Sequence, residues 1–106
     1  MAKYLIEASY TIDGVNGVLK EGGSGRRAAI ERLVSGAGGT VEAFYFVFGD
    51  DDVVVVVDLP DNTTAAALSL AVSSAGGATT SVRVLLTPEE IDAAAQKTID
   101  YRAPGR

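Results

Sequence analysis

Two strongly apolar runs lie on either side of a short acidic turn between Phe44 and Asp61. In the sequence FYFVFGDDDVVVVVDLPD the residues are apolar at consecutive positions, which is typical of a β-hairpin buried on both faces. We therefore predict strands over Thr40 to Phe48 and Val53 to Leu59, joined by a turn over Gly49 to Asp52.

The remaining periodicity predicts two more strands, Lys3 to Tyr10 and Thr79 to Leu86, and three helical regions. The third helix has the clearest start, because Thr87 is followed by a proline and by Glu90 in the capping-box position. The first helical region has a short segment over Val15 to Lys20, a break at Gly22, Gly23 and Gly25, and a longer helix capped by Ser24 and ended by Gly38 and Gly39. The second runs from about Asn62 and is ended by Gly76 and Gly77. The third is a short helix after Thr87, and an irregular tail follows from Tyr101 to Arg106.

The element order β-α-β-β-α-β with a central hairpin predicts the ferredoxin-like fold, an α+β fold in which a four-stranded antiparallel sheet carries both main helices on one face. A chain of 106 residues is the usual size of one domain. We expect residues 1–106 to form a single domain, with residues 88–106 as a C-terminal helix and tail.

The other face of this sheet needs a cover. Five consecutive valines form one strand of the hairpin, and phenylalanines alternate with Tyr45 and Val47 in the other, so neither side of the hairpin is polar. A monomer would expose an apolar patch on the order of several hundred Å², more than soluble monomers usually tolerate. A two-fold axis lets such a patch cover itself, so we expect a homodimer, or a larger homo-oligomer, packed through the sheet face.

Several segments resemble the GYD domain family. They are KYLIEASYT, KEGGSGRRAAIE, FGDDDVVVVVDLPD and VLLTPEEID, which together extend over nearly the whole chain. The resemblance implies the dimeric α+β barrel form of the ferredoxin-like fold and implies no particular biochemical function. The tyrosine of the family's naming motif corresponds to Asp51 here, so no role of that tyrosine carries over.

Composition excludes several classes of chemistry and of partner. The chain has no cysteine, which excludes disulfides and thiolate chemistry, and no histidine, the commonest metal ligand and general base. A net charge of -5 disfavours nucleic acid and anionic membranes, which both require a basic surface. The sequence MAKYLIEASY lacks a long apolar segment, so we expect a cytoplasmic protein, and no feature predicts a cofactor.

A first candidate site combines residues of the first and last predicted strands and of the hairpin. Glu7 and Ser9 point to one side of the first strand, and Arg83 can meet Glu7 because these strands are neighbours in the predicted fold. With Tyr10 and Tyr45 they would form a small polar pocket, a candidate ligand site, between the sheet and its partner. The simpler interpretation is a cross-strand ion pair at a hydrated dimer rim, because such pairs are often only structural.

A second candidate is the glycine-rich stretch that ends in Arg26 and Arg27. Glycines before a helix can turn backbone N–H groups toward an anion, and arginines add charge. The spacing matches no nucleotide-binding motif, so a flexible helix break with solvated arginines is the simpler interpretation.

The acidic turn Asp50 to Asp52 invites a metal-binding interpretation, but the spacing of a calcium loop is absent. Turn formation explains these aspartates better, because their side chains accept hydrogen bonds from nearby backbone N–H groups. We therefore predict no metal site.

Three classes of function stay open. We favour a small-molecule binding module with its pocket between the sheet and a partner. The second class is a cofactor-independent enzyme, by analogy with oxygenases and isomerases of the same barrel, with Glu7, Tyr10, Tyr45 or Arg83 as its acid-base or oxyanion groups. The third is a structural oligomer in which the last helix and the tail through Tyr101 and Arg102 wrap around a neighbour.

Overall fold

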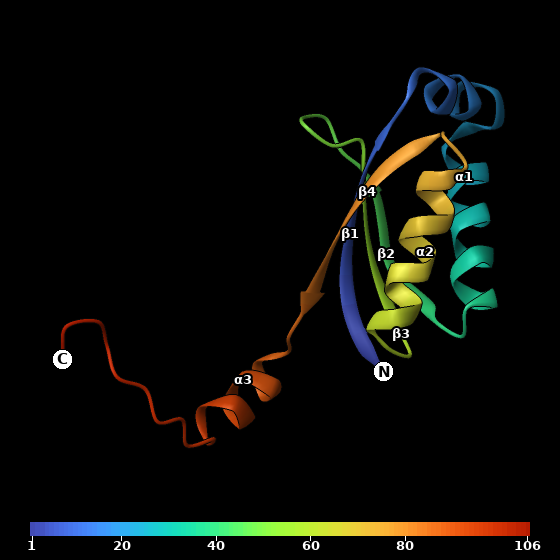
Figure 1. Cartoon of the computed structure of the whole chain (residues 1–106). Helices are drawn as coiled ribbons and strands as arrows, with labels where there is room; N and C mark the ends of the chain where they lie inside the picture. Colours follow the sequence, from blue (N-terminus) through green and yellow to red (C-terminus); the bar gives the residue numbers. More distant parts are fainter.

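The computed structural model describes residues 1–106 and contains a four-stranded sheet and three helices (Figure 1). The elements in chain order are β1 (Ala2–Tyr10), α1 (Ile12–Gly36), β2 (Thr40–Phe46), β3 (Val53–Leu59), α2 (Asn62–Ser74), β4 (Ala78–Leu85) and α3 (Pro88–Ala95). All strand pairs are antiparallel in the order β2-β3-β1-β4, and α1 and α2 lie on one face of the sheet. The predicted ferredoxin-like α+β fold is confirmed.

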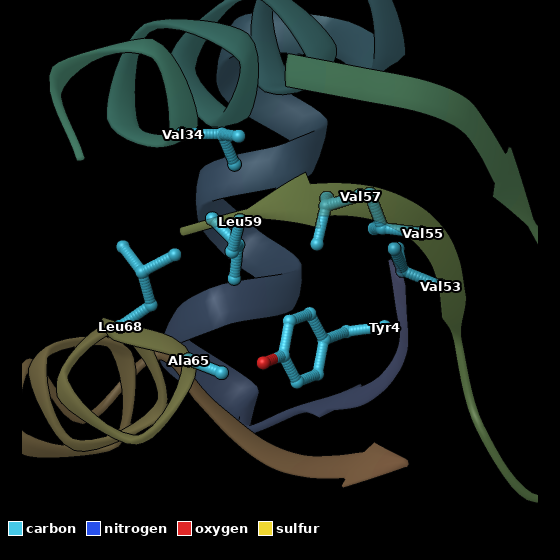
Figure 2. Close-up of a cluster of buried hydrophobic side chains, with 8 residues drawn as sticks. All are labelled: Tyr4, Val34, Val53, Val55, Val57, Leu59, Ala65 and Leu68. Carbon is cyan, nitrogen blue, oxygen red and sulfur yellow. The ribbon is translucent and has the colours of Figure 1, made fainter. Parts of the chain in front are cut away.

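The core lies between the sheet and the two main helices (Figure 2). Side chains of β3 alternate between buried and half-buried, because successive residues of a strand point to opposite faces. Tyr4 of β1 is 1% exposed, and its hydroxyl donates a hydrogen bond of 2.6 Å to Asn62 Oδ1 at the start of α2. The eight buried residues of this cluster are Tyr4, Val34, Val53, Val55, Val57, Leu59, Ala65 and Leu68.

The strand β2 is two residues shorter than predicted. Its last residue, Phe46, pairs with Val53, and the Val47 N–H then donates to the Asp52 carbonyl at 2.8 Å, which closes the loop. Val47 and Phe48 therefore lie outside the sheet, and the Phe48 side chain is fully exposed. The prediction of a strand to Phe48 was wrong because the loop begins before the apolar run ends.

The helix α1 continues through the glycine-rich stretch with a single kink. Thr11 is its N-cap, and Thr11 Oγ1 accepts a hydrogen bond from the Gly14 N–H at 3.2 Å. The kink is at Gly22, whose φ of 79° lies in a region that favours glycine. The predicted break is confirmed there, but the predicted N-cap at Ser24 was wrong, because the helical path resumes at once and Ser24 lies within the helix.

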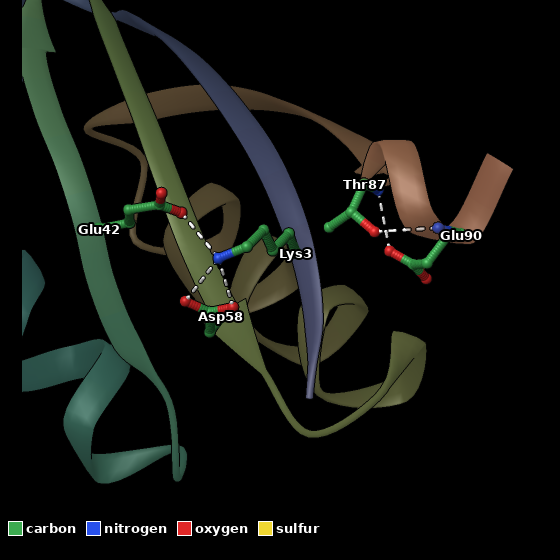
Figure 3. Close-up of polar contacts among 5 residues, drawn as sticks. All are labelled: Lys3, Glu42, Asp58, Thr87 and Glu90. Carbon is green, nitrogen blue, oxygen red and sulfur yellow. Dashed lines mark hydrogen bonds and ion pairs between the residues drawn. The ribbon is translucent and has the colours of Figure 1, made fainter. Parts of the chain in front are cut away.

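The last residues of α1 and α2 and the start of α3 follow the predicted signals. Gly38 and Gly76 have φ of 85° and 82° just after α1 and α2, the left-handed conformation with which many helices end. Asp61 caps α2 by accepting hydrogen bonds from the Thr64 N–H and hydroxyl at 2.8 and 2.7 Å. Thr87 and Glu90 form the capping box of α3 (Figure 3).

The helix α3 and the irregular tail extend away from the sheet (Figure 1). Every residue of α3 is exposed, including Ile91, so the helix contributes nothing to the core. None of the three helices combines the length and apolar character required to cross a membrane.

Candidate functional site

Four of the five residues predicted for the first site share the face of the sheet that α1 and α2 leave uncovered. We call it the open face; Leu5, Val54 and Val56 lie at its centre, and Glu7 and Arg83 lie beside them. Strand register places its side chains in rows across the four strands. One row is Tyr45, Val54, Glu7 and Ser81, and the next is Ala43, Val56, Leu5 and Arg83.

Glu7 and Arg83 meet across the ladder, as predicted. Glu7 Oε1 lies 3.2 Å from Arg83 Nη1, and the two side chains are 19% and 67% exposed. Although the pair is close, its geometry does not form a hydrogen bond, and the buried Glu7 Oε1 has no other partner. A buried carboxylate oxygen without a donor is uncommon in folded proteins, so this oxygen has capacity for one more hydrogen bond.

One end of the open face is charged. Lys3 Nζ donates to Glu42 Oε2 at 2.9 Å and to Asp58 Oδ1 at 3.0 Å (Figure 3). These hydrogen bonds, first that to Glu42 and then that to Asp58, raise the pKa of Lys3 above its ordinary value of 10.5. The open face is thus apolar only in its centre, whereas the sequence predicted that neither side of the hairpin would be polar.

Ser9 lies at the other end of the open face, against the acidic turn. Its hydroxyl donates to Asp51 Oδ1 at 3.1 Å and to the Asp50 carbonyl at 3.2 Å. Asp52 accepts a hydrogen bond from the Tyr10 N–H at 2.8 Å. The turn is thus attached to the end of β1. The side chains of Asp51 and Asp52 bond this strand, whereas the sequence predicted hydrogen bonds to backbone N–H groups of the turn itself. No group of three or more acidic side chains is arranged to hold a metal ion.

Tyr10 lies on the opposite face from the other four candidates. It continues the alternation of Tyr4, Ile6 and Ala8 in β1 and so points toward α1. The prediction that Tyr10 shares a pocket with Glu7 and Ser9 was wrong, because residues 9 and 10 are adjacent in a strand and their side chains point to opposite sides.

Arg26 and Arg27, the residues predicted to bind an anion together, point to different places. Arg27 Nε lies 3.8 Å from Glu31 Oε1 on the outer side of α1. Arg26 Nη1 lies 3.4 Å from Glu21 Oε1 and borders a cleft that Arg27 does not reach. The two arginines therefore do not form a single anion site, since consecutive helical residues face different directions.

The cleft beside Arg26 lies between α1, α2 and the end of β1. We call it the helix cleft; its volume is about 360 Å³, and its wall includes Tyr10, Gly17, Glu21, Arg26, Ala71 and Ala75. A smaller cavity of about 60 Å³ adjoins it over the sheet and shares Tyr10, Arg26, Leu33, Val72 and Ala78 with it. The structure thus brings together one residue from each of the two predicted sites, Tyr10 and Arg26.

Burial and charge act in opposite directions on Tyr10. Burial raises the pKa of its phenol above the ordinary value of 10.0, and the neighbouring Arg26 guanidinium partly opposes this rise. The hydroxyl is therefore protonated at neutral pH and available as a hydrogen-bond donor.

Glu21 is a residue of the helix cleft that the sequence did not single out. It stands five positions before Arg26, on the other side of the Gly22 kink. In a regular helix this spacing does not bring side chains together, so only the kinked backbone reveals the contact.

Comparison with known families gives a match over most of the chain. The family model described as GYD domain matches residues 4–95. No curated protein sequence and no solved structure matches the chain.

Proposed function

The chain belongs to the GYD domain family, and we propose that it acts as a homodimer that binds a small polar molecule between two open faces. The observation that carries this proposal is the buried Glu7 Oε1, which has no hydrogen-bond partner although Arg83 lies 3.2 Å away. A ligand that donates a hydrogen bond to this oxygen would satisfy it.

The pair also indicates what the ligand offers. Arg83 is 67% exposed and retains unused N–H donors beside a carboxylate that lacks one. A molecule with a hydroxyl or amide N–H for Glu7 and a carbonyl or carboxylate oxygen for Arg83 fits both groups. Charge-assisted hydrogen bonds of this kind are about twice as strong as neutral ones.

A second copy of the chain is the cover that suits the open face best. The centre of the face is apolar, with Leu5, Val54 and Val56 half-buried even though no helix lies over them. Under a two-fold axis these side chains would pack against their own copies, and the charged group at Lys3 would stay at the rim. Enclosure would also exclude water from the Glu7–Arg83 pair and strengthen its contacts with a ligand.

Native mass spectrometry of gently purified protein tests assembly and ligand together. We expect a dimer that carries a reproducible extra mass, and a Val56→Asp variant that is a folded monomer by circular dichroism. Ala67→Asp, on the exposed side of α2, is the matched control and should remain dimeric. A monomeric parent protein would refute the proposal.

Two further variants separate ligand binding from assembly. Glu7→Gln and Arg83→Ala should lose the extra mass and keep the dimer. Loss of the dimer in both variants, with no extra mass in the parent protein, would show that the ion pair is only a structural contact.

A further inference from the structure

The helix cleft has the size of a ligand site and lies on the other side of the sheet from the open face. Its volume of about 360 Å³ falls within the range of small-molecule sites, about 300–1,000 Å³. We propose that the helix cleft binds a small apolar carboxylate, with the carboxylate at Arg26 and Tyr10 and the hydrocarbon part along the apolar wall. This site is separate from the one proposed between two open faces.

The wall of the cleft supports an apolar ligand body. Ala71 and Val72 of α2 and its C-cap residue Ala75 form one side, and Val18 and Leu33 of α1 form the other. The adjoining cavity of about 60 Å³ is lined mainly by aliphatic core residues and has room for the end of a short chain. An apolar group placed there would be transferred out of water, which is favourable, and would not leave a buried polar group without a hydrogen-bond partner.

Arg26 supplies the charge that a carboxylate requires. Its contact with Glu21 is a single one, with Nη1 and Oε1 3.4 Å apart, longer than the usual 2.7–2.9 Å or so of a charge-assisted hydrogen bond. The guanidinium therefore keeps N–H donors for a second anion. Arg26 borders both the cleft and the inner cavity, whereas Glu21 borders only the cleft, so the cation is closer to the apolar interior.

Tyr10 complements Arg26 from the sheet side. Burial raises the pKa of its phenol, so that the group stays a neutral donor at neutral pH. A hydroxyl and a guanidinium on adjacent elements can both donate to one carboxylate and orient it.

Gly17 provides a way to close the cleft without disturbing its walls. A side chain at this position would meet no atom within 4 Å, since the position opens on the cleft. Gly17→Phe should therefore fill the space that the ligand would occupy. Asn16→Phe adds the same ring at the neighbouring exposed position, which does not line the cleft, and serves as the matched control.

Calorimetric titration of the full chain with octanoate, octan-1-ol and octylamine tests the proposal. We expect octanoate to bind more tightly than the alcohol or the amine. Arg26→Gln should weaken octanoate binding roughly tenfold, the effect of losing one charged hydrogen bond, and change octanol binding less than about twofold. Gly17→Phe should abolish binding of octanoate and octanol, and Asn16→Phe should leave both unchanged.

Amide chemical shifts locate the bound octanoate. Shifts at Tyr10, Arg26 and Ala75 with none at Val54 and Val56 would support the helix cleft. No octanoate binding, binding that survives Gly17→Phe, tighter binding of octylamine, or shifts confined to the open face would each overturn the proposal. A parent protein that is monomeric but binds octanoate in the cleft would refute the dimer proposal alone.

Discussion

Glu7 on β1 and Arg83 on β4 meet diagonally across neighbouring strands, with Glu7 Oε1 3.2 Å from Arg83 Nη1, although the two side chains differ widely in exposure. The carboxylate is largely covered by the sheet, and the guanidinium extends into solvent. Removing the arginine therefore leaves a buried charge behind, whereas removing the carboxylate leaves only a solvated cation. The two single substitutions are not equivalent.

Arg83→Ala should lower the free energy of unfolding by about 1 kcal/mol, because the covered Glu7 carboxylate loses its nearest cation. In a Glu7→Gln background the same substitution should have almost no effect. Urea unfolding of the four proteins at one protein concentration measures the difference, since self-association would otherwise contribute to stability. Equal effects of Arg83→Ala in both backgrounds would show that the pair does not interact energetically.

Tyr4→Phe should destabilise the fold by about 1 kcal/mol, because Asn62 Oδ1 loses its 2.6 Å donor while the ring still fills the core. Leu59→Ala, which opens a cavity in the same core, should cost about 2–5 kcal/mol. Denaturant midpoints give both values. If Tyr4→Phe were as damaging as Leu59→Ala, the hydroxyl would have a structural role beyond the contact with Asn62.

The hairpin and the helix ends were predictable because their signals are local. The consecutive valines form β3, Thr87 caps the residues that follow it, and Gly38 ends the helix that precedes it, so each signal acts within a few positions and the structure has each in the predicted role. The cross-strand contact of Glu7 with Arg83 was also predictable, because the fold fixes which strands are neighbours.

The helix cleft was not predictable, because its wall combines residues from β1, α1 and α2. Its position depends on the angle of the kink at Gly22, which the sequence marks only as a break. The face on which Tyr10 lies is a different case. Side chains alternate between the two faces along β1, so the sequence already placed Tyr10 on the side of the helices and Ser9 on the opposite side.

Asp61→Asn should reduce the pH dependence of stability in acid. Hydrogen bonds from the Thr64 side chain and then its backbone N–H lower the pKa of the Asp61 carboxyl from its ordinary value of 3.8. A lowered folded-state pKa means that the stabilisation is complete above pH 3.8 and is lost as the pH falls through the folded-state pKa below it. Asparagine is a good N-cap without this titration.

Urea unfolding midpoints of the parent protein and the Asp61→Asn variant, measured from about pH 2 to about pH 6, test the direction in which stability changes with pH. The parent should lose stability more steeply than the variant below about pH 4. Asp61→Ala is the control for the cap itself and should be less stable than Asp61→Asn throughout. Parallel pH profiles for parent and Asp61→Asn would contradict the linkage.

A chain that ends at Leu86 should keep the fold of residues 1–85, because every residue of α3 and every residue of the tail except Ala103 is exposed. An eight-residue helix is only marginally stable in water, even with the capping box at Thr87. The circular dichroism spectrum and the unfolding midpoint of this shorter chain should therefore differ little from those of the parent protein. A clear fall in the midpoint would mean that α3 packs against another copy of the chain in solution.

Gly14→Ala and Gly17→Ala should change stability in opposite directions although both glycines lie in the first half of α1. A methyl group at Gly14 would overlap the Gly77 carbonyl oxygen, the same oxygen that accepts a hydrogen bond from the Thr11 N–H at 3.0 Å. Gly14→Ala should push these segments apart and destabilise the protein by about 1–3 kcal/mol. Gly17 has open space around it, so alanine there should stabilise the helix by about 0.5–1 kcal/mol. Thermal unfolding of the two variants tests both expectations. If both variants lower the midpoint, helix propensity does not govern stability at position 17. If both raise it, the close approach of Gly14 and Gly77 does not fix the start of α1 against the end of α2.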